Sequence, residues 1–235
     1  MAARRSRAAH AGTGETRAAS GSLPVLVTGF EPFGGEDTNP SWEICRQLPA
    51  AIGRARVHTL RVPTEFRRAI EVVAGEIERL DPALVILLGQ AGGRPCLSVE
   101  RVAINVDDAR IADNAGWQPV DEPVAPAGPA AYFATVPIKA MTAAIREAGV
   151  PAEVSNSAGT FVCNHLLYGV LHYLAASGRT ARAGFIHVPW LEGQAVTRPG
   201  QPAMALATMV RGVEAAIAAA LDTAVDVKMA AGTLD

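Results

Sequence analysis

The sequence contains few cysteines. Cys45, Cys96 and Cys163 are the three in 235 residues, and they form neither a CxxC pair nor a cysteine–histidine spacing typical of zinc sites. An odd number of widely spaced cysteines argues against a disulfide framework and against a structural metal. We therefore expect a protein of the reducing cytoplasm that needs no metal and no cofactor.

Net charge and long apolar runs are also lacking. Lysine and arginine number 21 and aspartate and glutamate 23, for a net charge of −2, which argues against a nucleic-acid or anionic-membrane partner. No apolar run reaches the roughly 18 residues of a membrane span. Although glycine is common, neither GxGxxG nor GxxxxGK[ST] occurs, so the sequence does not predict a phosphate site.

Residues 1–22 contain almost nothing to bury. They are rich in arginine and alanine, have no lysine, and include Glu15 as their one acidic residue. A secretory signal would need an apolar segment, and a transit peptide an amphipathic pattern, and both are missing. We expect a disordered basic extension over residues 1–22, or a start codon placed too early, followed by one domain over residues 23–235.

From Pro24 onward, apolar strand-like segments alternate with amphipathic helical ones. Strands are predicted at 24–29, 56–62, 83–89, 98–106 and 182–188, and helices at 40–48, 64–80 (capped by Thr64), 138–148, 161–176 and 204–221. This alternation predicts an α/β sheet with helices on both faces. In such sheets, sites lie beyond the carboxyl ends of the strands. The long polar stretch 107–129 is a further candidate for a functional loop.

Cys163 follows a polar turn and opens an apolar helical run. In the first turn of a helix, the positive end of the helix dipole favours the thiolate over the thiol. His187 lies on a separate predicted strand, and a cysteine with such a histidine is the beginning of a nucleophilic site. The alternative is that Cys163 is a small core residue. Glu100 is either a surface carboxylate paired with Arg101 or the acid that orients His187.

Four segments resemble the type I pyroglutamyl peptidases. They are GFEPFGG followed by NPSW, GQAGGR with the downstream ERVAIN and DAR, SAGTFVCNHLLY, and GFIHVP, and they extend from about Val25 to Pro189. The resemblance implies a single-domain three-layer α/β/α sandwich with a twisted, mostly parallel central sheet. It also implies a homo-oligomer, tetramer or dimer, that acts in the cytoplasm on N-terminally pyroglutamylated peptides.

The same resemblance implies roles for individual residues. Cys163 would be the nucleophile, His187 the base and Glu100 the orienting acid. The implied substrate-binding residues are Phe30, Phe33, Gln90, Ile111 and Phe161. The backbone N–H of Cys163 would stabilise the oxyanion, with Arg110 nearby. The implied activity is a cysteine exopeptidase that hydrolyses the amide bond after an N-terminal pyroglutamyl (5-oxoprolyl) residue through an acyl-enzyme. The alternatives are a cysteine amidase acting on another small lactam and a non-catalytic ligand-binding protein of the same fold.

The remaining cysteines and histidines favour structural roles. Cys45 lies on the apolar face of a predicted helix and is expected in the core, and Cys96 is an accessory thiol or a bystander. His165 is expected to pack or to face solvent. A zinc site from Cys163, His165 and His187 is disfavoured, because residues i and i+2 of a helix point apart.

Overall fold

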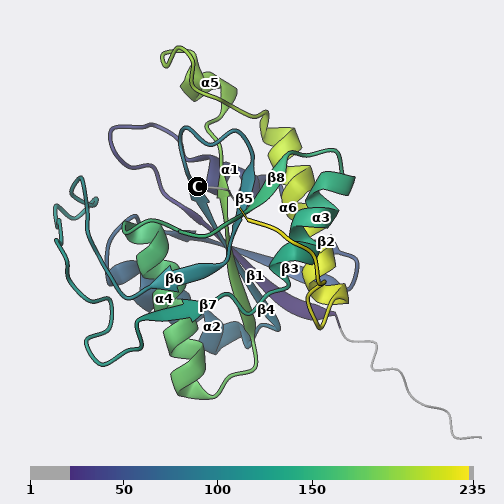
Figure 1. Cartoon of the computed structure of the whole chain (residues 1–235), viewed down its shortest axis with the longest axis horizontal. Coiled ribbons are helices and arrows are strands. Elements are labelled where there is room, and N and C mark those ends of the chain that lie inside the picture. The colour runs from purple at the N-terminus through teal and green to yellow at the C-terminus, as the bar shows by residue number, and fades with distance from the viewer. Residues whose placement is uncertain (1–21, 233–235) are drawn as a thin grey trace, which may run out of the picture.

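Helices and strands alternate along residues 22–232, the part of the chain that the computed structural model describes (Figure 1). In chain order the elements are β1 (Leu23–Phe30), α1 (Pro40–Gln47), β2 (Ala51–Ile52), β3 (Ala55–Val62), α2 (Arg68–Leu80), β4 (Leu84–Gln90), β5 (Leu97–Glu100), β6 (Val102–Ile104), β7 (Ala131–Phe133), α3 (Ile138–Glu147), β8 (Ala152–Ser155), α4 (Val162–Ser177), β9 (Arg182–Val188), α5 (Glu192–Ala195) and α6 (Leu206–Asp222). Except for Ser22, the extension predicted over residues 1–22 lies outside the described residues. No helix between residues 22 and 232 is long and apolar enough to cross a membrane.

The main sheet within these residues has seven strands in the order β2-β3-β1-β4-β9-β5-β8. Strands β3, β1, β4 and β9 pair in parallel, as do β5 and β8, whereas β5 runs antiparallel to β9 and β2 antiparallel to β3. The predicted α/β fold with a mostly parallel sheet is confirmed. Because β5 runs antiparallel to β9, Ser98 pairs with His187 and Val99 with Ile186.

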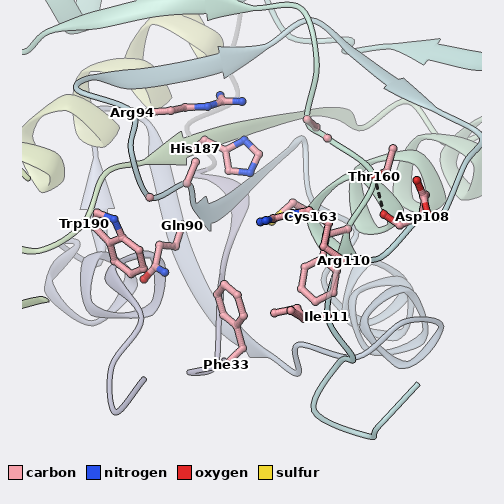
Figure 2. A pocket seen from close by; sticks show the side chains of 15 residues that line it. Phe33, Gln90, Arg94, Asp108, Arg110, Ile111, Thr160, Cys163, His187 and Trp190 are labelled. Atoms are coloured by element: carbon pink, nitrogen blue, oxygen red, sulfur yellow. Dashed lines mark hydrogen bonds between the residues drawn. The ribbon is translucent and has the colours of Figure 1, made fainter. Parts of the chain in front are cut away.

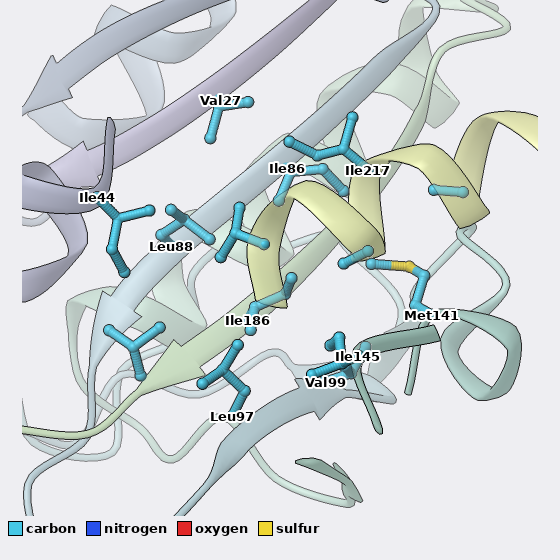
Figure 3. Close-up of a cluster of buried hydrophobic side chains, with 14 of the residues drawn as sticks. Val27, Ile44, Ile86, Leu88, Leu97, Val99, Met141, Ile145, Ile186 and Ile217 are labelled. Carbon is cyan, nitrogen blue, oxygen red and sulfur yellow. The ribbon is translucent and has the colours of Figure 1, made fainter. Parts of the chain in front are cut away.

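Helices cover the sheet on both faces, with α1, α3 and α6 on one side and α2 and α4 on the other (Figure 1). Strand β4 is buried along its whole length, which explains why its sequence is continuously apolar rather than alternating. Figure 3 shows Ile86 of β4 next to Ile217 of α6, in the same buried cluster as Leu88, Ile186 and Met141 of α3. Burying each such side chain contributes about 1.5–3 kcal/mol.

Helix α2 does not begin where the sequence predicts. The hydroxyl of Thr64 donates to the carbonyl of Glu31 at 3.0 Å, and its N–H donates to the Glu31 carboxylate at 3.2 Å. The helix instead begins at Arg68, after Arg67 with a positive φ of 60°. The predicted cap is therefore wrong, because Thr64 is engaged by the loop that follows β1.

The strand predicted over residues 98–106 is two strands. Arg101 separates them, and its N–H donates to the carbonyl of Ser155 at 2.9 Å, next to the pairing of β5 with β8. Beyond Arg101 the chain leaves the main sheet, and β6 pairs antiparallel with β7. An apolar run does not by itself show where a strand changes partners.

Candidate active site

Helix α4 places Cys163 in its first turn. The turn before it contains Gly159 at a positive φ of 77°, which glycine adopts without strain. The hydroxyl of Thr160 donates to the carbonyl of Asp108 at 2.7 Å, and the N–H of Asp108 donates to the carbonyl of Thr160 at 3.0 Å. These bonds join the start of the cysteine helix to the long polar stretch 107–129.

Gly89, near the end of β4, provides room for the thiol. A Cβ at this position would lie 2.8 Å from Sγ of Cys163 and 2.6 Å from Cζ of Phe185. Both distances are too short for any real methyl group. The glycine therefore allows the cysteine helix to approach the end of the central strand closely.

Glu100 and His187 form a buried hydrogen-bonded pair. Nδ1 of His187 lies 2.7 Å from Oε1 of Glu100, and the two residues are 4% and 0% exposed. Ser98 is directly opposite His187 in the β5–β9 pairing, so Glu100, two residues further along, is a diagonal neighbour on the same face. Arg94 donates to the same carboxylate oxygen, also at 2.7 Å.

The surroundings of Glu100 favour its ionised form. Burial alone would raise its pKa, but the hydrogen bond from His187, the electrostatic attraction to that imidazole and the positive charge of Arg94 lower the pKa below its usual value. An ionised carboxylate only accepts hydrogen bonds, so Nδ1 of His187 carries the proton in this bond, and Nε2 is not engaged by Glu100. The alternative pairing with Arg101 is wrong, because Arg101 donates to Asn156 at 2.9 Å instead.

Burial raises the pKa of the Cys163 thiol to about 12; the nearby charge of Glu100 also raises it, and Arg94 partly opposes the rise. This direction is opposite to the shift expected from the helix dipole, because desolvation outweighs the dipole at this position. Among the described residues, no hydrogen bond joins Cys163 to His187. The imidazole of His187, a group that can accept a proton, lines the same cavity wall as the thiol.

Cys163 and His187 both line a cavity of about 450 Å³ (Figure 2). Phe33, Gln90, Ala91, Gly92, Arg94, Asp108, Arg110, Ile111, Ala158, Gly159, Thr160, Phe161 and Trp190 complete its wall. Of the predicted substrate-binding residues, Phe33, Gln90, Ile111 and Phe161 thus lie on the cavity, as does Arg110. Glu100 lies behind His187 rather than on the wall.

Phe30 is the one predicted substrate-binding residue that the main cavity lacks. It is 2% exposed and lines a smaller pocket that also reaches Cys163. The other residues of this side pocket are Phe33, Asn39, Thr64, Gln90, Phe161, Val162 and Cys163. The side pocket therefore combines phenylalanine walls with the amides of Asn39 and Gln90 and the Thr64 hydroxyl.

The sequence did not identify the supports behind the cysteine helix. His165 is neither simply packed nor solvent-facing: its Nδ1 donates to Asp107 at 2.8 Å, and its Nε2 accepts the N–H of Arg67 at 2.7 Å. Because a backbone N–H can only donate, this arrangement fixes the neutral tautomer. His165 thereby joins α4 to the segment before α2, and it is not a wall residue of the Cys163 cavity.

Asn164, next to the cysteine, has a similar role. Its side chain accepts the N–H of Ile104 at 2.9 Å and donates to the carbonyls of Ile104 and Val106 at 2.9 and 3.0 Å. The only sequence signal for these supports is the position of Asn164 and His165 directly after Cys163. The two other cysteines are buried, as expected for Cys45, and burial raises the pKa of Cys96 to about 11.

Comparisons with known proteins give one consistent result. The family model for pyroglutamyl peptidase matches residues 23–223. The pyrrolidone-carboxylate peptidase of Erwinia tasmaniensis is 56% identical over 209 residues, which cover 88% of this chain and 97% of that protein. The corresponding protein of Bacillus mycoides is 50% identical over 209 residues, with the same coverage of both chains.

Solved structures agree with this result. Pyroglutamyl peptidase I from Bacillus amyloliquefaciens superimposes with a TM-score of 0.86 at 41% identity, over 89% of this chain and 100% of that one. Pyrrolidone carboxyl peptidase from Thermococcus litoralis has a TM-score of 0.85 at 38% identity, over 88% and 99%. Likeness of this extent in both sequence and fold shows that the chain belongs to the pyroglutamyl peptidase family.

Proposed function

We propose that the chain is a cysteine exopeptidase that hydrolyses the amide bond after an N-terminal pyroglutamyl residue of peptides. Membership of the family supports the reaction. The observation that carries the assignment of roles is that one cavity exposes both Cys163 and His187, while buried Glu100 lies 2.7 Å behind the imidazole. This arrangement supplies a nucleophile, a base and an acid that orients the base.

In the proposed reaction, Nε2 of His187 takes the proton of the Cys163 thiol as Sγ attacks the carbonyl carbon of the pyroglutamyl residue. Glu100 accepts the bond from Nδ1–H and stabilises the imidazolium that forms. The backbone N–H of Cys163, at the start of α4, stabilises the oxyanion, and the guanidinium of Arg110 is the second donor. The C–N bond then breaks, and the imidazolium gives its proton to the departing amine.

The second half of the reaction releases pyroglutamate. His187 removes a proton from water, the hydroxide attacks the thioester, and the C–S bond breaks. Sγ recovers the proton through the same imidazole. No metal or cofactor takes part in any of these steps, since the cysteine and the histidine supply the nucleophile and the proton carrier.

The main cavity at Cys163 has room for a neutral lactam, whereas the side pocket, of about 10 Å³, holds no more than one water molecule. A pyroglutamyl ring has no charged amine, and Phe33 and Phe161 give it flat apolar walls, with Phe30 behind them in the side pocket. Its ring N–H and C=O need hydrogen bonds, for which Gln90, on the cavity wall, is a side-chain candidate. Ile111 lies on the wall of the larger cavity, and we assign it to the same substrate. A prolyl residue, with a charged amine and no ring carbonyl, should be a poor substrate.

We also propose that residues 23–235 form the catalytic domain, that residues 1–22 are an extension not needed for catalysis, and that the protein acts in the cytoplasm as a homo-oligomer, either a tetramer or a dimer. The family match over residues 23–223 supports the domain. A free nucleophilic thiol is consistent with a reducing compartment.

The assignment is tested by release of a fluorescent amine from a pyroglutamyl amide. The wild type should turn the substrate over, and Cys163→Ala should reduce the rate by at least about 10³-fold, because the nucleophile is lost. Cys96→Ala is the matched control and should keep the wild-type rate. A folded, reduced wild type without turnover would exclude the peptidase, whereas comparable rates on prolyl and pyroglutamyl amides would exclude the proposed lactam specificity.

A further inference from the structure

Gln194, on the short helix α5, is buried beside the cavity but does not line it. Its Oε1 accepts the N–H of Leu191 at 3.1 Å. Its Nε2 lies 3.0 Å from Oε2 of Glu36, 3.3 Å from the carbonyl of Thr38 and 3.1 Å from Oε1 of Gln90. One carboxamide thus connects the segment 36–38 and the start of its own helix to the cavity residue Gln90.

The chemistry of these partners fixes which way both carboxamides point. The N–H of Leu191 can only donate, so the Gln194 atom that it meets is the oxygen. The Glu36 carboxylate and the Thr38 carbonyl can only accept, so the atom facing them is the nitrogen. An amino group facing Gln90 requires the carbonyl of Gln90 on that side, which leaves the amino group of Gln90 pointing elsewhere.

That amino group is open to the cavity. Nε2 of Gln90 donates a hydrogen bond to none of the described residues. The atom is nevertheless not fully buried. Gln90 lines both the main cavity and the side pocket next to Cys163. The side chain therefore presents a hydrogen-bond donor, not an acceptor, to whatever occupies the site.

The segment that holds Gln194 is itself fixed by an ion pair. Arg198 forms a salt bridge with Glu36, and its guanidinium lies 4.5 Å from the centre of the Trp190 ring, which is part of the cavity wall. Glu36 therefore receives Arg198 on one oxygen and Gln194 on the other. The contacts of Glu36 with Arg198 and Gln194 keep the Gln194 amino group next to Gln90.

We infer that Gln194 is a positioning residue that sets the polarity of the Gln90 carboxamide, so that its amino group donates to the ring carbonyl of the lactam. The inference rests on the proposed function, because the ring carbonyl belongs to the proposed substrate. The donor helps to distinguish a lactam from a ring without a carbonyl, since such a ring would leave the Gln90 amino group unpaired.

Two substitutions of Gln194 separate polarity from packing. Gln194→Glu keeps the oxygen that accepts from Leu191 but replaces the donor with an acceptor, so the Gln90 amide should turn and present its oxygen to the lactam carbonyl. Gln194→Met keeps the length and removes both polar atoms, so the Gln90 amide is no longer held in one orientation. The exposed Gln47→Glu, on α1, is the control for an added charge.

We expect kcat/KM on a pyroglutamyl amide to fall about tenfold or more in Gln194→Glu and about threefold in Gln194→Met, mainly through KM, because the contact is made in the ground state as well as in the transition state. Gln47→Glu should match the wild type. In a Gln90→Met background, neither change of Gln194 should lower kcat/KM further. The inference would be overturned if the Gln194 changes lowered kcat/KM as much in the Gln90→Met background as in the wild type. It would also be overturned if kcat/KM were unchanged in all variants.

A second readout does not need turnover. Protection of Cys163 from iodoacetamide by 2-pyrrolidinone, followed by mass spectrometry, should weaken in the same order across the variants. If the wild type showed no turnover but 2-pyrrolidinone still protected Cys163 in a way that depended on Gln194, the peptidase would be refuted and the positioning role supported. Turnover that depends on Cys163, together with protection that ignores Gln194, would refute the positioning role alone.

Discussion

At the scale of single residues, Glu100 supports the site from behind. One of its oxygens accepts from both His187 and Arg94, each at 2.7 Å, in a place with no exposure to solvent. A buried carboxylate is stable only when such partners compensate its lost hydration. The bond from His187 holds the imidazole in one tautomer and orientation at the cavity wall, and the bond from Arg94 holds the carboxylate in place.

Replacing Glu100 by glutamine should therefore slow the reaction without affecting binding. Glu100→Gln keeps the shape but loses the negative charge that stabilises the imidazolium, so kcat on a pyroglutamyl amide should fall about 10²-fold or more with little change in KM. The exposed Glu147→Gln, on α3, is the matched control. Steady-state kinetics of the three proteins are the measurement, and a kcat within threefold of the wild type would remove Glu100 from the mechanism.

At the scale of elements, the close approach of β4 and α4 depends on Gly89. We expect Gly89→Ala to cost about 1–3 kcal/mol of folding free energy and to lower kcat at least tenfold, because the added methyl would overlap Phe185 and Cys163. Gly75→Ala, in helix α2 where a Cβ would meet nothing within 4 Å, should instead stabilise the protein by about 0.5–1 kcal/mol. Urea unfolding and amide hydrolysis measure both effects. Equal behaviour of the two variants would contradict the close approach.

A second contact between elements is made by Asn164. Asn164→Ala removes three hydrogen bonds to Ile104 and Val106 and leaves their partly buried backbone groups without these partners, so unfolding should need about 2–4 kcal/mol less free energy. The neighbouring Cys163→Ala leaves these bonds intact and should lose activity but keep nearly all of its stability. If both variants were equally stable, Asn164 would not hold the helix to this segment.

The elements that the sequence predicted best are those whose pattern is decided locally. The apolar segments 24–29, 83–89 and 182–188 are strands, and the helix predicted from residue 40 is α1, Pro40–Gln47. The predicted cap at Thr64 failed because its hydroxyl bonds to Glu31, far away in the sequence. Polarity and spacing cannot show such a competing partner.

At the scale of the whole molecule, the reversed strand β5 brings the site together. Glu100 comes from β5, His187 from β9, and Cys163 from the start of α4, so three elements converge at one edge of the sheet. The family resemblance indicated these residues because it compares whole motifs. It did not indicate Arg94 as the partner of Glu100, or Gln194 behind Gln90, because those contacts appear only when distant segments pack.

The charge of Glu100 also links the stability of the whole molecule to pH. Its pKa is lower in the folded protein than its usual value of 4.5, so protons bind the unfolded chain more readily. The stabilisation is therefore fully present above about pH 4.5 and is lost as the pH falls through the lower folded pKa. Between pH 4.5 and the folded pKa, the free energy of unfolding of the wild type should fall by up to about 1.4 kcal/mol per pH unit more than that of Glu100→Gln, which has no proton to take up at this position.

Urea unfolding of the wild type, Glu100→Gln and Glu147→Gln at several pH values from 6 to about 3.5 tests this linkage. The free energy of unfolding of Glu147→Gln should follow that of the wild type at every pH. The difference in this free energy between the wild type and Glu100→Gln should narrow only below about pH 4.5. A wild type that gained free energy of unfolding relative to Glu100→Gln as the pH fell from 6 to 5 would mean that the folded pKa of Glu100 is raised rather than lowered. The carboxylate would then take up a proton within the working range of the site, and it could not hold His187 in the proposed tautomer.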